Sequence, residues 1–355
     1  MSIILAYRAE SVGPICRHLA AEDNRIKVVH EDDLPGMKLI SDRPVQQPAP
    51  IDPLIGEWND AQELARAFVN VQLGRSEVVK QGISELLNQI QKVQAEIAKP
   101  APVAPPPVAA GPKNVLIRFG TRWEGAADIE INSAQAVRNA RDKRESRRIL
   151  VGTGLTPQTW FNRDDIRTPA VIRPRRHHAG RKFYVCNTRQ EIDRAIARCG
   201  PGWYASELIK KAKEYRVFIL QDRVIRVSEK FPANADEIAW NFAVGGKTLG
   251  VKRKFWPVAA IKASLLAARK LNLQWTAVDV ALDEAGKAFV FEANTQPGIT
   301  GRYAVEQVGW AFASILDHLN LPLVDLARAE KWQDFIHPSL NVKEDDGEVA
   351  VGRAA

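Results

Sequence analysis

Cysteine is scarce in this chain of 355 residues, which contains only Cys16, Cys186 and Cys199. The number is odd, and no two of these cysteines stand at the C-x-x-C spacing of a zinc or redox motif. This pattern argues against a disulfide framework and against structural zinc. We therefore expect a protein of the reducing cytosol, that is, a cytoplasmic protein.

Long apolar runs are also missing. No stretch reaches the roughly 20 residues of a membrane-spanning helix, so we expect no membrane partner. The opening MSIILAYRAESVGPI carries its first charge, Arg8, after its apolar residues, so it predicts a first β-strand and not a signal peptide. With 45% hydrophobic and 26% charged residues, the composition is typical of a soluble globular protein of one large or two smaller domains.

Acidic residues are outnumbered by basic ones. The 42 Asp and Glu against 50 Lys and Arg give a net charge of +8, with an isoelectric point near 9.4. Such a balance favours a polyanionic partner, which a nucleic acid, an acidic protein, or a nucleotide triphosphate with an acidic substrate would each provide. The nine tryptophans are scattered, and we interpret them as packing residues and not as a platform for stacked bases.

One segment differs in composition from the rest. Lys99 to Pro112, KPAPVAPPPVAAGP, predicts an extended polyproline-type spacer. Before it, apolar residues recur at the a and d positions of a heptad: Val79, Ile83, Leu86, Ile90, Val93 and Ile97. This stripe would form either a self-associating coiled-coil helix or a helix that packs on its own domain. In both cases residues 51–112 are predicted to be an insertion.

Alternating strand and helix patterns flank the insertion. Ile3 to Tyr7, Ile26 to Val29 and Asn114 to Phe119 are predicted strands, and Val12 to Ala21 and Ser133 to Ile149 are predicted helices, which together favour a small, mostly parallel α/β sheet. Beyond Gly154 the pattern is α+β with antiparallel hairpins. The expected strands there are 170–173, 182–185, 204–209, 214–221, 224–231, 276–282 and 288–294, and the expected helices are 188–198, 258–271 and 305–319.

The domain organisation follows from these patterns. We expect an N-terminal α/β part at residues 1–50, the insertion at 51–112, a continuation of the first domain at 113–150, and a second domain at 151–330. Residues 331–355, which end in KEDDGEVAVGRAA, are predicted to be a flexible tail.

The richest chemistry lies in AVDVALDEAGKAFVFEANTQPGIT, residues 277–300. Two strand patterns flank a turn-forming cluster that ends in Gly286, which predicts a β-hairpin. Glu292 and Asn294 share one face of the second strand, and Asp279 on the first strand would lie near them. Two carboxylates and an amide oxygen are ligands for Mg²⁺ or Mn²⁺. The alternative is a solvated outer face of an amphipathic hairpin.

Further motifs follow one order along the chain. They are Arg141-Asp142-Lys143, Ile172-Arg173-Pro174, Glu207-Leu208-Ile209, the loop Trp240-Asn241-Phe242-Ala243-Val244-Gly245-Gly246 and the segment FEANTQPGITG. In this order, between Asn114 and Leu319, they resemble the motifs of the ATP-grasp superfamily, most of all those of RimK-type glutamate ligases and glutathione synthetases. The resemblance implies an ATP-grasp fold of α/β and α+β type, preceded by a small α/β domain and interrupted by the helical and proline-rich insertion.

The resemblance also implies ATP and Mg²⁺ (or Mn²⁺) as cofactors. The residues implied to bind ATP are Lys143 and Arg173 at the phosphates, Arg176 and Gly180 in the covering loop, Glu207, Leu208 and Ile209 at the adenine, and Glu214 at the ribose. The residues implied in catalysis are Arg216, Lys230 and Asn241, and those implied to hold the metal are Asp279, Glu292 and Asn294.

This sequence departs from the family pattern at two places. The covering loop keeps only Gly180 of its usual glycines, and it contains His177 and His178, which we interpret as lining the phosphates. Ala239 stands where the family has an arginine two residues before the loop asparagine, which removes one contact to an anion.

The implied function is an ATP-dependent ligase that joins a carboxylate to an amine through an acylphosphate, with a small molecule, a peptide or a protein as acceptor. Two other classes remain open. The basic runs RRIL, RPRRHH, IKKAK and VKRK would suit a nucleic-acid-binding protein. The heptad stripe, the spacer and Ala239 would suit a non-catalytic assembly protein on an ATP-grasp scaffold.

Overall fold

The computed structural model describes residues 2–7, 26–30, 114–125, 127–177, 182–234, 237–240, 245–299 and 301–340. The chain divides into two compact units, one of residues 1–37 and 112–355 and the other of residues 38–111. The predicted helix 12–21, the heptad stripe, the spacer and the last part of the tail lie outside the described residues. In the described part, the helices are too short or too polar to cross a membrane.

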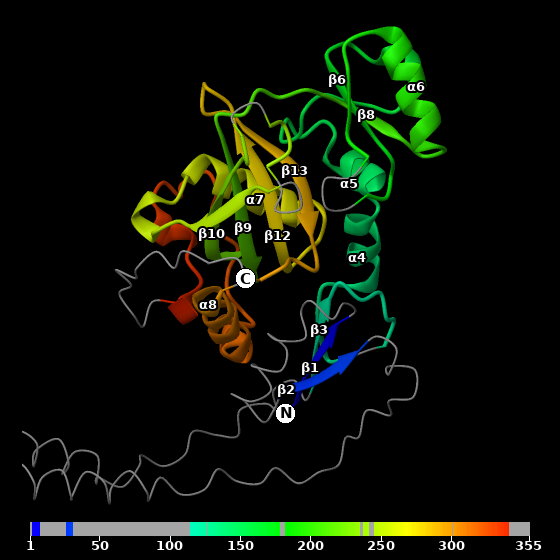
Figure 1. The fold of residues 1–355 in the computed structure, drawn as a ribbon. Helices are drawn as coiled ribbons and strands as arrows, with labels where there is room; N and C mark the ends of the chain where they lie inside the picture. Colours follow the sequence, from blue (N-terminus) through cyan, green and yellow to red (C-terminus); the bar gives the residue numbers. More distant parts are fainter. Residues whose placement is uncertain are drawn as a thin grey trace, which may run out of the picture. The chain divides into compact units, whose positions relative to one another are not determined.

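The first sheet is parallel throughout. It contains β1 (Ser2–Tyr7), β2 (Ile26–His30), β3 (Asn114–Phe119) and β4 (Ile129–Ile131) in the order β2-β1-β3-β4 (Figure 1). β1 and β3 are neighbours although they lie far apart in the sequence. The central strand β3 is almost wholly buried, as expected for a parallel sheet, and includes the buried Arg118, which pairs with Glu130 at 2.7 Å. The predicted small parallel sheet is therefore confirmed.

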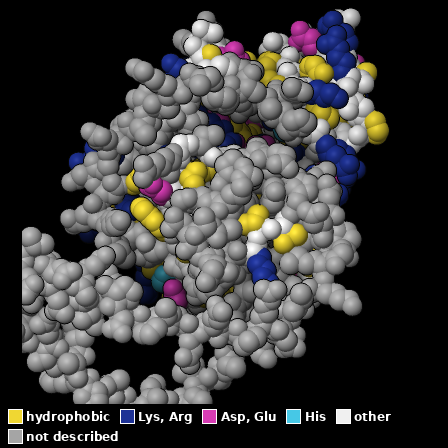
Figure 2. Space-filling view, turned by 60° about the horizontal axis from the view of Figure 1, so that its bottom comes forward, with side chains coloured by type: hydrophobic (Ala, Val, Ile, Leu, Met, Phe, Trp, Pro, Cys, Tyr) yellow, Lys and Arg dark blue, Asp and Glu magenta, His cyan; other side chains and the backbone are white. Residues whose placement is uncertain are grey.

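The second sheet is antiparallel and small. Its strands are β5 (Thr159–Trp160), β6 (Ala170–Arg173), β7 (Tyr184–Cys186) and β8 (Tyr204–Glu207), in the order β5-β8-β6-β7. Helix α6 (Arg189–Cys199) packs on it through Ile192 and Ala195, and begins at a capping box of Thr188 and Glu191. Lys and Arg side chains gather at the upper right of Figure 2, and Figure 1 draws this sheet and α6 in that region.

The third sheet carries most of the core. Its strands are β9 (Lys213–Leu220), β10 (Arg223–Phe231), β11 (Lys247–Gly250), β12 (Trp275–Leu282) and β13 (Ala288–Asn294), in the order β11-β10-β9-β12-β13. Helices α7 (Val258–Lys270) and α8 (Arg302–Ala313) pack against it. The Trp275 ring lies 5.3 Å from Phe119 and 4.9 Å from Phe312, so β3, β12 and α8 share one core. The predicted mixture of α/β and α+β structure is confirmed.

The arginine-rich helix expected at Ser133 to Ile149 is two helices, α4 (Ala134–Arg141) and α5 (Lys143–Leu150). The chain breaks at Asp142, whose backbone is extended and whose side chain accepts a hydrogen bond from the Glu145 amide at 3.2 Å. Asp142 therefore acts as the N-cap of a new helix, a role that aspartate favours over the helix interior. The break places Lys143 at the start of α5.

The C-terminal boundaries also differ from expectation. Helix α8 ends at Ala313, and a 3₁₀ turn follows at Ile315–His318. Residues 331–340 of the predicted tail are packed, with short 3₁₀ helices at Trp332–Phe335 and Pro338–Leu340. Phe335 and His337 are fully buried there. The apolar residues of this segment complete the core beside β10, where Ile336 forms a bridge with Val224.

Asn132 joins the first and third sheets, so its loss should be costly. Its Oδ1 accepts from the amides of Gln274 and Trp275 at 3.0 Å each, and its Nδ2 donates to the Trp275 carbonyl at 2.7 Å. We expect Asn132→Ala to lower the free energy of unfolding by about 3 kcal/mol, because buried groups lose their partners. Urea unfolding measures this loss. Asn132→Gly is the control for backbone strain, because Asn132 has φ 64, a conformation that glycine adopts without strain and alanine does not. A loss below about 0.5 kcal/mol would contradict the prediction.

His337 should make the fold acid-sensitive. Burial, followed by the neighbouring His318 and Arg223, lowers its pKa to about 3, whereas an unfolded histidine has a pKa near 6.5. As pH falls below about 6.5, His337 is protonated in the unfolded chain but not in the folded one. The free energy of unfolding therefore declines by up to ~1.4 kcal/mol per pH unit. We expect His337→Gln to reduce the slope of the melting temperature between pH 6.5 and 4.5. An identical slope in both proteins would refute this.

Candidate functional site

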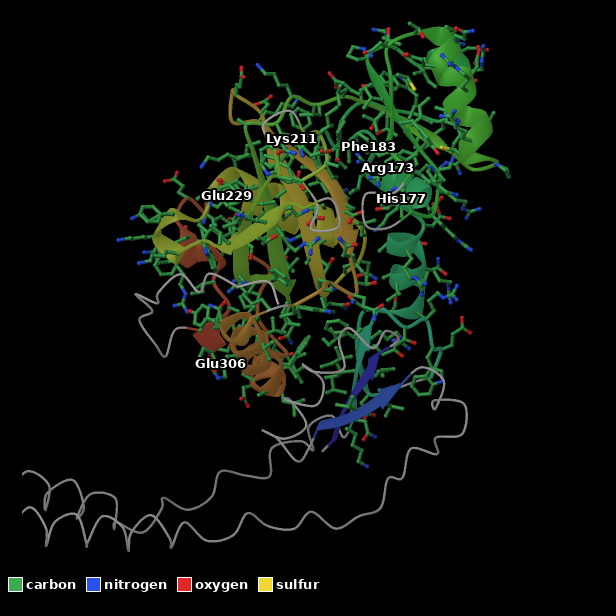
Figure 3. The ribbon with its side chains drawn as sticks, in the orientation of Figure 1. Arg173, His177, Phe183, Lys211, Glu229 and Glu306 are labelled. Carbon is green, nitrogen blue, oxygen red and sulfur yellow. The ribbon has the colours of Figure 1, made fainter. Side chains whose placement is uncertain are left out.

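The second sheet contributes a group of polar side chains that face β13. The Arg173 guanidinium at the end of β6 lies 5.4 Å from the centre of the Phe183 ring, and His177 follows in the next loop (Figure 3). His177 Nε2 is 2.9 Å from the hydroxyl of Tyr204. Burial, followed by the positive charge of Arg173, lowers the pKa of His177 to about 3, so its imidazole is neutral.

Some polar atoms of this group lack a partner, as does one of Arg147 on α5, whose guanidinium lies 5.9 Å from the centre of the Tyr204 ring. Arg147 Nη1, Arg173 Nε and His177 Nδ1 are buried without a hydrogen-bond partner in the described part of the chain. Buried donors of this kind are usually satisfied by water or by a ligand. Because two of the three belong to guanidinium groups, an anion would satisfy them best.

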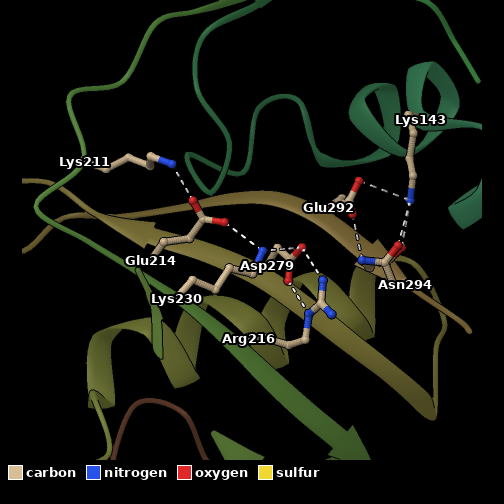
Figure 4. Close-up of polar contacts among 9 residues, drawn as sticks. Lys143, Lys211, Glu214, Arg216, Lys230, Asp279, Glu292 and Asn294 are labelled. Carbon is tan, nitrogen blue, oxygen red and sulfur yellow. Dashed lines mark hydrogen bonds and ion pairs between the residues drawn. The ribbon is translucent and has the colours of Figure 1, made fainter. Parts of the chain in front are cut away.

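The hairpin of β12 and β13 forms as predicted. Its turn is closed by the Asp283 amide, which donates to the Lys287 carbonyl at 3.1 Å, and Gly286 adopts φ 78. Asp279 lies directly opposite Glu292 in the register. Asn294 Nδ2 donates to Glu292 Oε1 at 2.8 Å. The structure thus brings the three predicted metal residues together on one face of the hairpin (Figure 4).

A chain of alternating charges surrounds Asp279. We call it the charge chain, and its members in order are Lys211, Glu214, Lys230, Asp279 and Arg216. The contacts along it are Lys211 Nζ to Glu214 Oε2 at 2.5 Å, Lys230 Nζ to Glu214 Oε1 at 2.8 Å, Lys230 Nζ to Asp279 Oδ2 at 2.8 Å, and Arg216 Nε and Nη2 to Asp279 at 2.8 and 3.0 Å (Figure 4).

The strand register creates this chain. Arg216 on β9 lies opposite Asp279 on β12, and Glu214 on β9 lies opposite Lys230 on β10. Opposite charges directly across a sheet attract one another. The predicted catalytic residues Arg216 and Lys230 and the predicted ribose residue Glu214 therefore meet the predicted metal residue Asp279.

Ionisation in the site is governed by burial and by these neighbours. Burial alone would raise the pKa of Asp279, but Arg216 and Lys230 outweigh it and hold that pKa below its ordinary value. Burial likewise opposes ionisation of Glu292, yet Lys143 and the Asn294 amide hold its pKa well below the ordinary range. Both carboxyls are thus ionised and able to face a cation.

Helix α5 covers the free edge of the third sheet. β13 is the outermost strand, and two cations of α5 donate to its carbonyl oxygens. Lys143 Nζ lies 3.3 Å from the oxygen of Ala293, and Arg147 Nη2 lies 2.9 Å from that of Phe291. Lys143 Nζ also lies 3.5 Å from Asn294 Oδ1 and 3.8 Å from Glu292 Oε2. The predicted phosphate residue Lys143 therefore lies at the predicted metal residues.

The other predicted site residues lie outside the hairpin and the charge chain. Glu207 is exposed at the end of β8, and Leu208 and Ile209 are half-buried in the link to β9. Arg176 is exposed beside Arg175, which pairs with Asp142. Gly180 and Asn241 lie outside the described residues.

Sequence reasoning missed two residues of the site. Lys211 was part of a basic run, yet its ammonium is buried 4.4 Å from the centre of the Trp240 ring and 5.8 Å from that of Phe291. Burial lowers the pKa of Lys211 in spite of Glu214. Arg147 also belonged to a basic run. Its position four residues after Lys143 on one helix was the available signal, since such residues share a face.

The donor set suits a hard cation. In the ranges that the structure describes, no three or more His, Cys, Asp or Glu side chains gather as a metal-binding group. A cation at the hairpin would instead be held by the carboxylates of Asp279 and Glu292 and the amide oxygen of Asn294. Oxygen donors of this type fit Mg²⁺ or Mn²⁺, which keep waters or phosphate oxygens as further ligands.

No protein-family model matches the sequence. The structure is similar to solved ligases at low identity. The ATP-grasp ligase PsnB complexed with minimal precursor, Mg and ADP has a TM-score of 0.49 at 13% identity, over 89% of this chain and 98% of that chain. D-alanine–D-alanine ligase from Bacillus anthracis complexed with ATP has 0.47 at 13%, over 89% and 94%. L-amino acid ligase from Bacillus licheniformis has 0.45 at 14%, over 85% and 68%.

Proposed function

We propose that this chain is an ATP-grasp ligase that joins a carboxylate to an amine and converts ATP to ADP and phosphate. The observation that carries this proposal is the convergence of Asp279, Glu292 and Asn294 with the cations Lys143 and Arg216 around one hairpin. The motif order of the sequence, which resembles that of RimK-type enzymes, supports the same assignment.

In this proposal the carboxylate oxygen of the substrate takes the γ-phosphoryl group, which gives an acylphosphate and ADP. The amine then attacks the carbonyl carbon, phosphate leaves, and the amine loses a proton. The protein mainly positions the reactants and neutralises charge. Asp279, Glu292 and Asn294 would hold Mg²⁺ or Mn²⁺, which supplies positive charge at the phosphates.

The remaining residues would bind ATP or offset charge. Arg173 and the unpartnered nitrogens of Arg147 and His177 suit the phosphates. Glu214 would accept from the ribose hydroxyls through the free lone pairs of its oxygens. Arg216 and Lys230 would offset charge at the transferred phosphoryl group, and the link Glu207 to Ile209 would meet the adenine.

For the substrates we propose only chemical classes. An amino acid, a peptide or a protein would serve as acceptor, and the net charge of +8 favours an acidic one. Exposed arginines of α6, including Arg194 and Arg198, lie in the region of the second sheet and would attract such a partner. We further propose a cytoplasmic location and self-association through residues 79–97.

The direct test is a screen for ADP release with Mg²⁺ over pairs of amino acids and acidic peptides. We expect release only when a carboxylate and an amine are both present, and a product whose mass is the sum of the two less one water. Hydroxylamine should trap the acylphosphate as a hydroxamate. A protein that neither binds Mg-ATP nor releases ADP with any pair would disprove the proposal.

A non-catalytic role is the second candidate, because both oxygens of Asp279 are already engaged by Arg216 and Lys230. Such a protein would bind nucleotide without turning it over. Nucleic-acid binding is less favoured, since the cations Arg147 and Lys211 of two basic runs are buried in the site and not on a surface. Binding to nucleic acid that weakens steeply with salt and ignores Mg-ATP would support it.

A further inference from the structure

The predicted metal residues are each held by a cation of the chain itself, but not equally firmly. Arg216 grips Asp279 with two bonds of 2.8 and 3.0 Å, and Lys230 bridges Asp279 and Glu214 at 2.8 Å to each. Lys143, by contrast, stands 3.3 to 3.8 Å from its three oxygen partners. Of the three cations that contact the predicted metal residues, Lys143 is therefore the most loosely held (Figure 4).

The position of Lys143 conflicts with that of a metal ion. Its ammonium faces Glu292 Oε2 and Asn294 Oδ1 together, and a magnesium ion on these oxygens would lie ~2.1 Å from each. An ammonium and a divalent cation at the same two oxygens repel one another strongly in a partly buried site. One of the two has to leave before the other binds.

The surroundings of Lys143 allow its side chain to move without its backbone. Its amide donates to the Arg175 carbonyl at 2.9 Å, and the preceding residue Asp142 caps α5. Four rotatable bonds separate this anchored backbone from the ammonium, which makes a lysine a mobile point charge. Phosphate oxygens are the acceptors that would compete for the Lys143 ammonium. Arg173 and Arg147 have unpartnered nitrogens nearby, which suit the same phosphates.

We propose that the Lys143 ammonium binds the Glu292 and Asn294 oxygens in the nucleotide-free protein, and we call it the resident cation. When nucleotide phosphates bind the ammonium instead, these oxygens become available to the metal. This proposal rests on the proposed metal site. It adds an order: the free protein binds divalent metal poorly, and nucleotide and metal bind together. Linkage requires each to raise the affinity for the other by the same factor.

The experiment titrates Mn²⁺ into nucleotide-free protein and measures free Mn²⁺ by electron paramagnetic resonance. Lys143→Met keeps the unbranched side chain without its terminal ammonium. This variant should bind Mn²⁺ about tenfold more tightly than wild type or better, a factor typical of coupled sites. Lys143→Gln, which keeps a donor for the Ala293 carbonyl, should change in the same direction. Adding Glu292→Gln to Lys143→Met should abolish the gain.

Lys213→Met is the matched control. Lys213 is a lysine of β9 outside the charge chain, and its ion pair is with Glu229 at 3.4 Å and not with Glu292 or Asn294. We expect its removal to leave Mn²⁺ affinity unchanged. An equal gain in Lys213→Met would show a general effect of lost positive charge and would overturn the proposal.

The outcomes separate this inference from the proposed function. Mn²⁺–ADP binding to wild type that Glu292→Gln abolishes would support the metal site; if Lys143→Met and Lys143→Gln then bind Mn²⁺ no better than wild type, the resident-cation proposal fails alone. Absence of Mn²⁺ binding in every protein, with or without ADP, would overturn both. Should both neutral variants unfold, refolding by Mn²⁺ alone supports the proposal and failure to refold overturns it.

Discussion

Glu292→Gln should lower the rate of ATP turnover on the order of 100-fold or more while the protein stays folded. Glutamine has nearly the same shape as glutamate and keeps an oxygen that accepts from Asn294 Nδ2, the contact seen at 2.8 Å. What it removes is the negative charge that would face the metal. Steady-state ADP release measures the rate, and the thermal unfolding transition reports whether the fold is intact.

Glu284→Gln provides the matched control for this experiment. Glu284 lies on the turn of the same hairpin, where it is exposed and pairs with Lys210 at 2.7 Å. The same chemical change there should leave turnover within about twofold of wild type, since exposed ion pairs contribute little. Wild-type turnover in Glu292→Gln with unchanged dependence on Mg²⁺ would contradict the assignment of Glu292 to the proposed metal site.

Lys230→Met should lower the free energy of unfolding by about 3 to 5 kcal/mol, a magnitude typical of a broken buried ion pair. Lys230 is 3% exposed and bridges Glu214 and Asp279. Its loss leaves two buried carboxylates facing one another with less positive charge between them. Urea unfolding at pH 7 with an unchanged m-value measures the effect.

Two further variants test the cause of that loss. Adding Glu214→Gln to Lys230→Met should recover part of the stability, because it removes one of the carboxylates that Lys230 compensates. Lys213→Met is the control, since Lys213 is exposed on β9 and lies 3.4 Å from Glu229; it should change stability by about 0.5 kcal/mol or less. A loss below about 1 kcal/mol in Lys230→Met would show that the charge chain does not stabilise the fold.

The sequence was sufficient to predict the hairpin but not its register. The turn at Asp283 to Gly286 and the period-two alternation of both strands predicted that they pair, and left open whether Asp279 lies opposite or diagonal to Glu292. A register shift between Asp279 and Val280 places Asp279 opposite Glu292. Most strands of the second half, and the helices α6 and α7, were likewise predicted to within a few residues, but β5 and β11 were not predicted and α8 ends six residues before the predicted boundary. These are local patterns, and local patterns are visible in a single sequence.

The charge chain could not be predicted in the same way. Lys211 and Lys230 are ordinary basic residues until the register of β9 against β10 brings Glu214 between them. Asp279 joins the chain only through the register of β9 against β12, which lie far apart in the sequence, and such a register depends on tertiary packing. The break of the arginine-rich helix at Asp142 was missed for a different reason, because a capping aspartate inside a basic run carries a weak local signal.

The contact of α5 with the outermost strand has a consequence for solubility. A sheet edge presents unpaired carbonyl and amide groups that can recruit a strand from another molecule and so begin an aggregate. In this protein the Phe291 carbonyl accepts a hydrogen bond from Arg147, and the Ala293 carbonyl accepts one from Lys143. Charged donors of a helix thus occupy the edge in place of another strand. The side chains that make the site attractive to anions thus also keep β13 from adding a foreign strand.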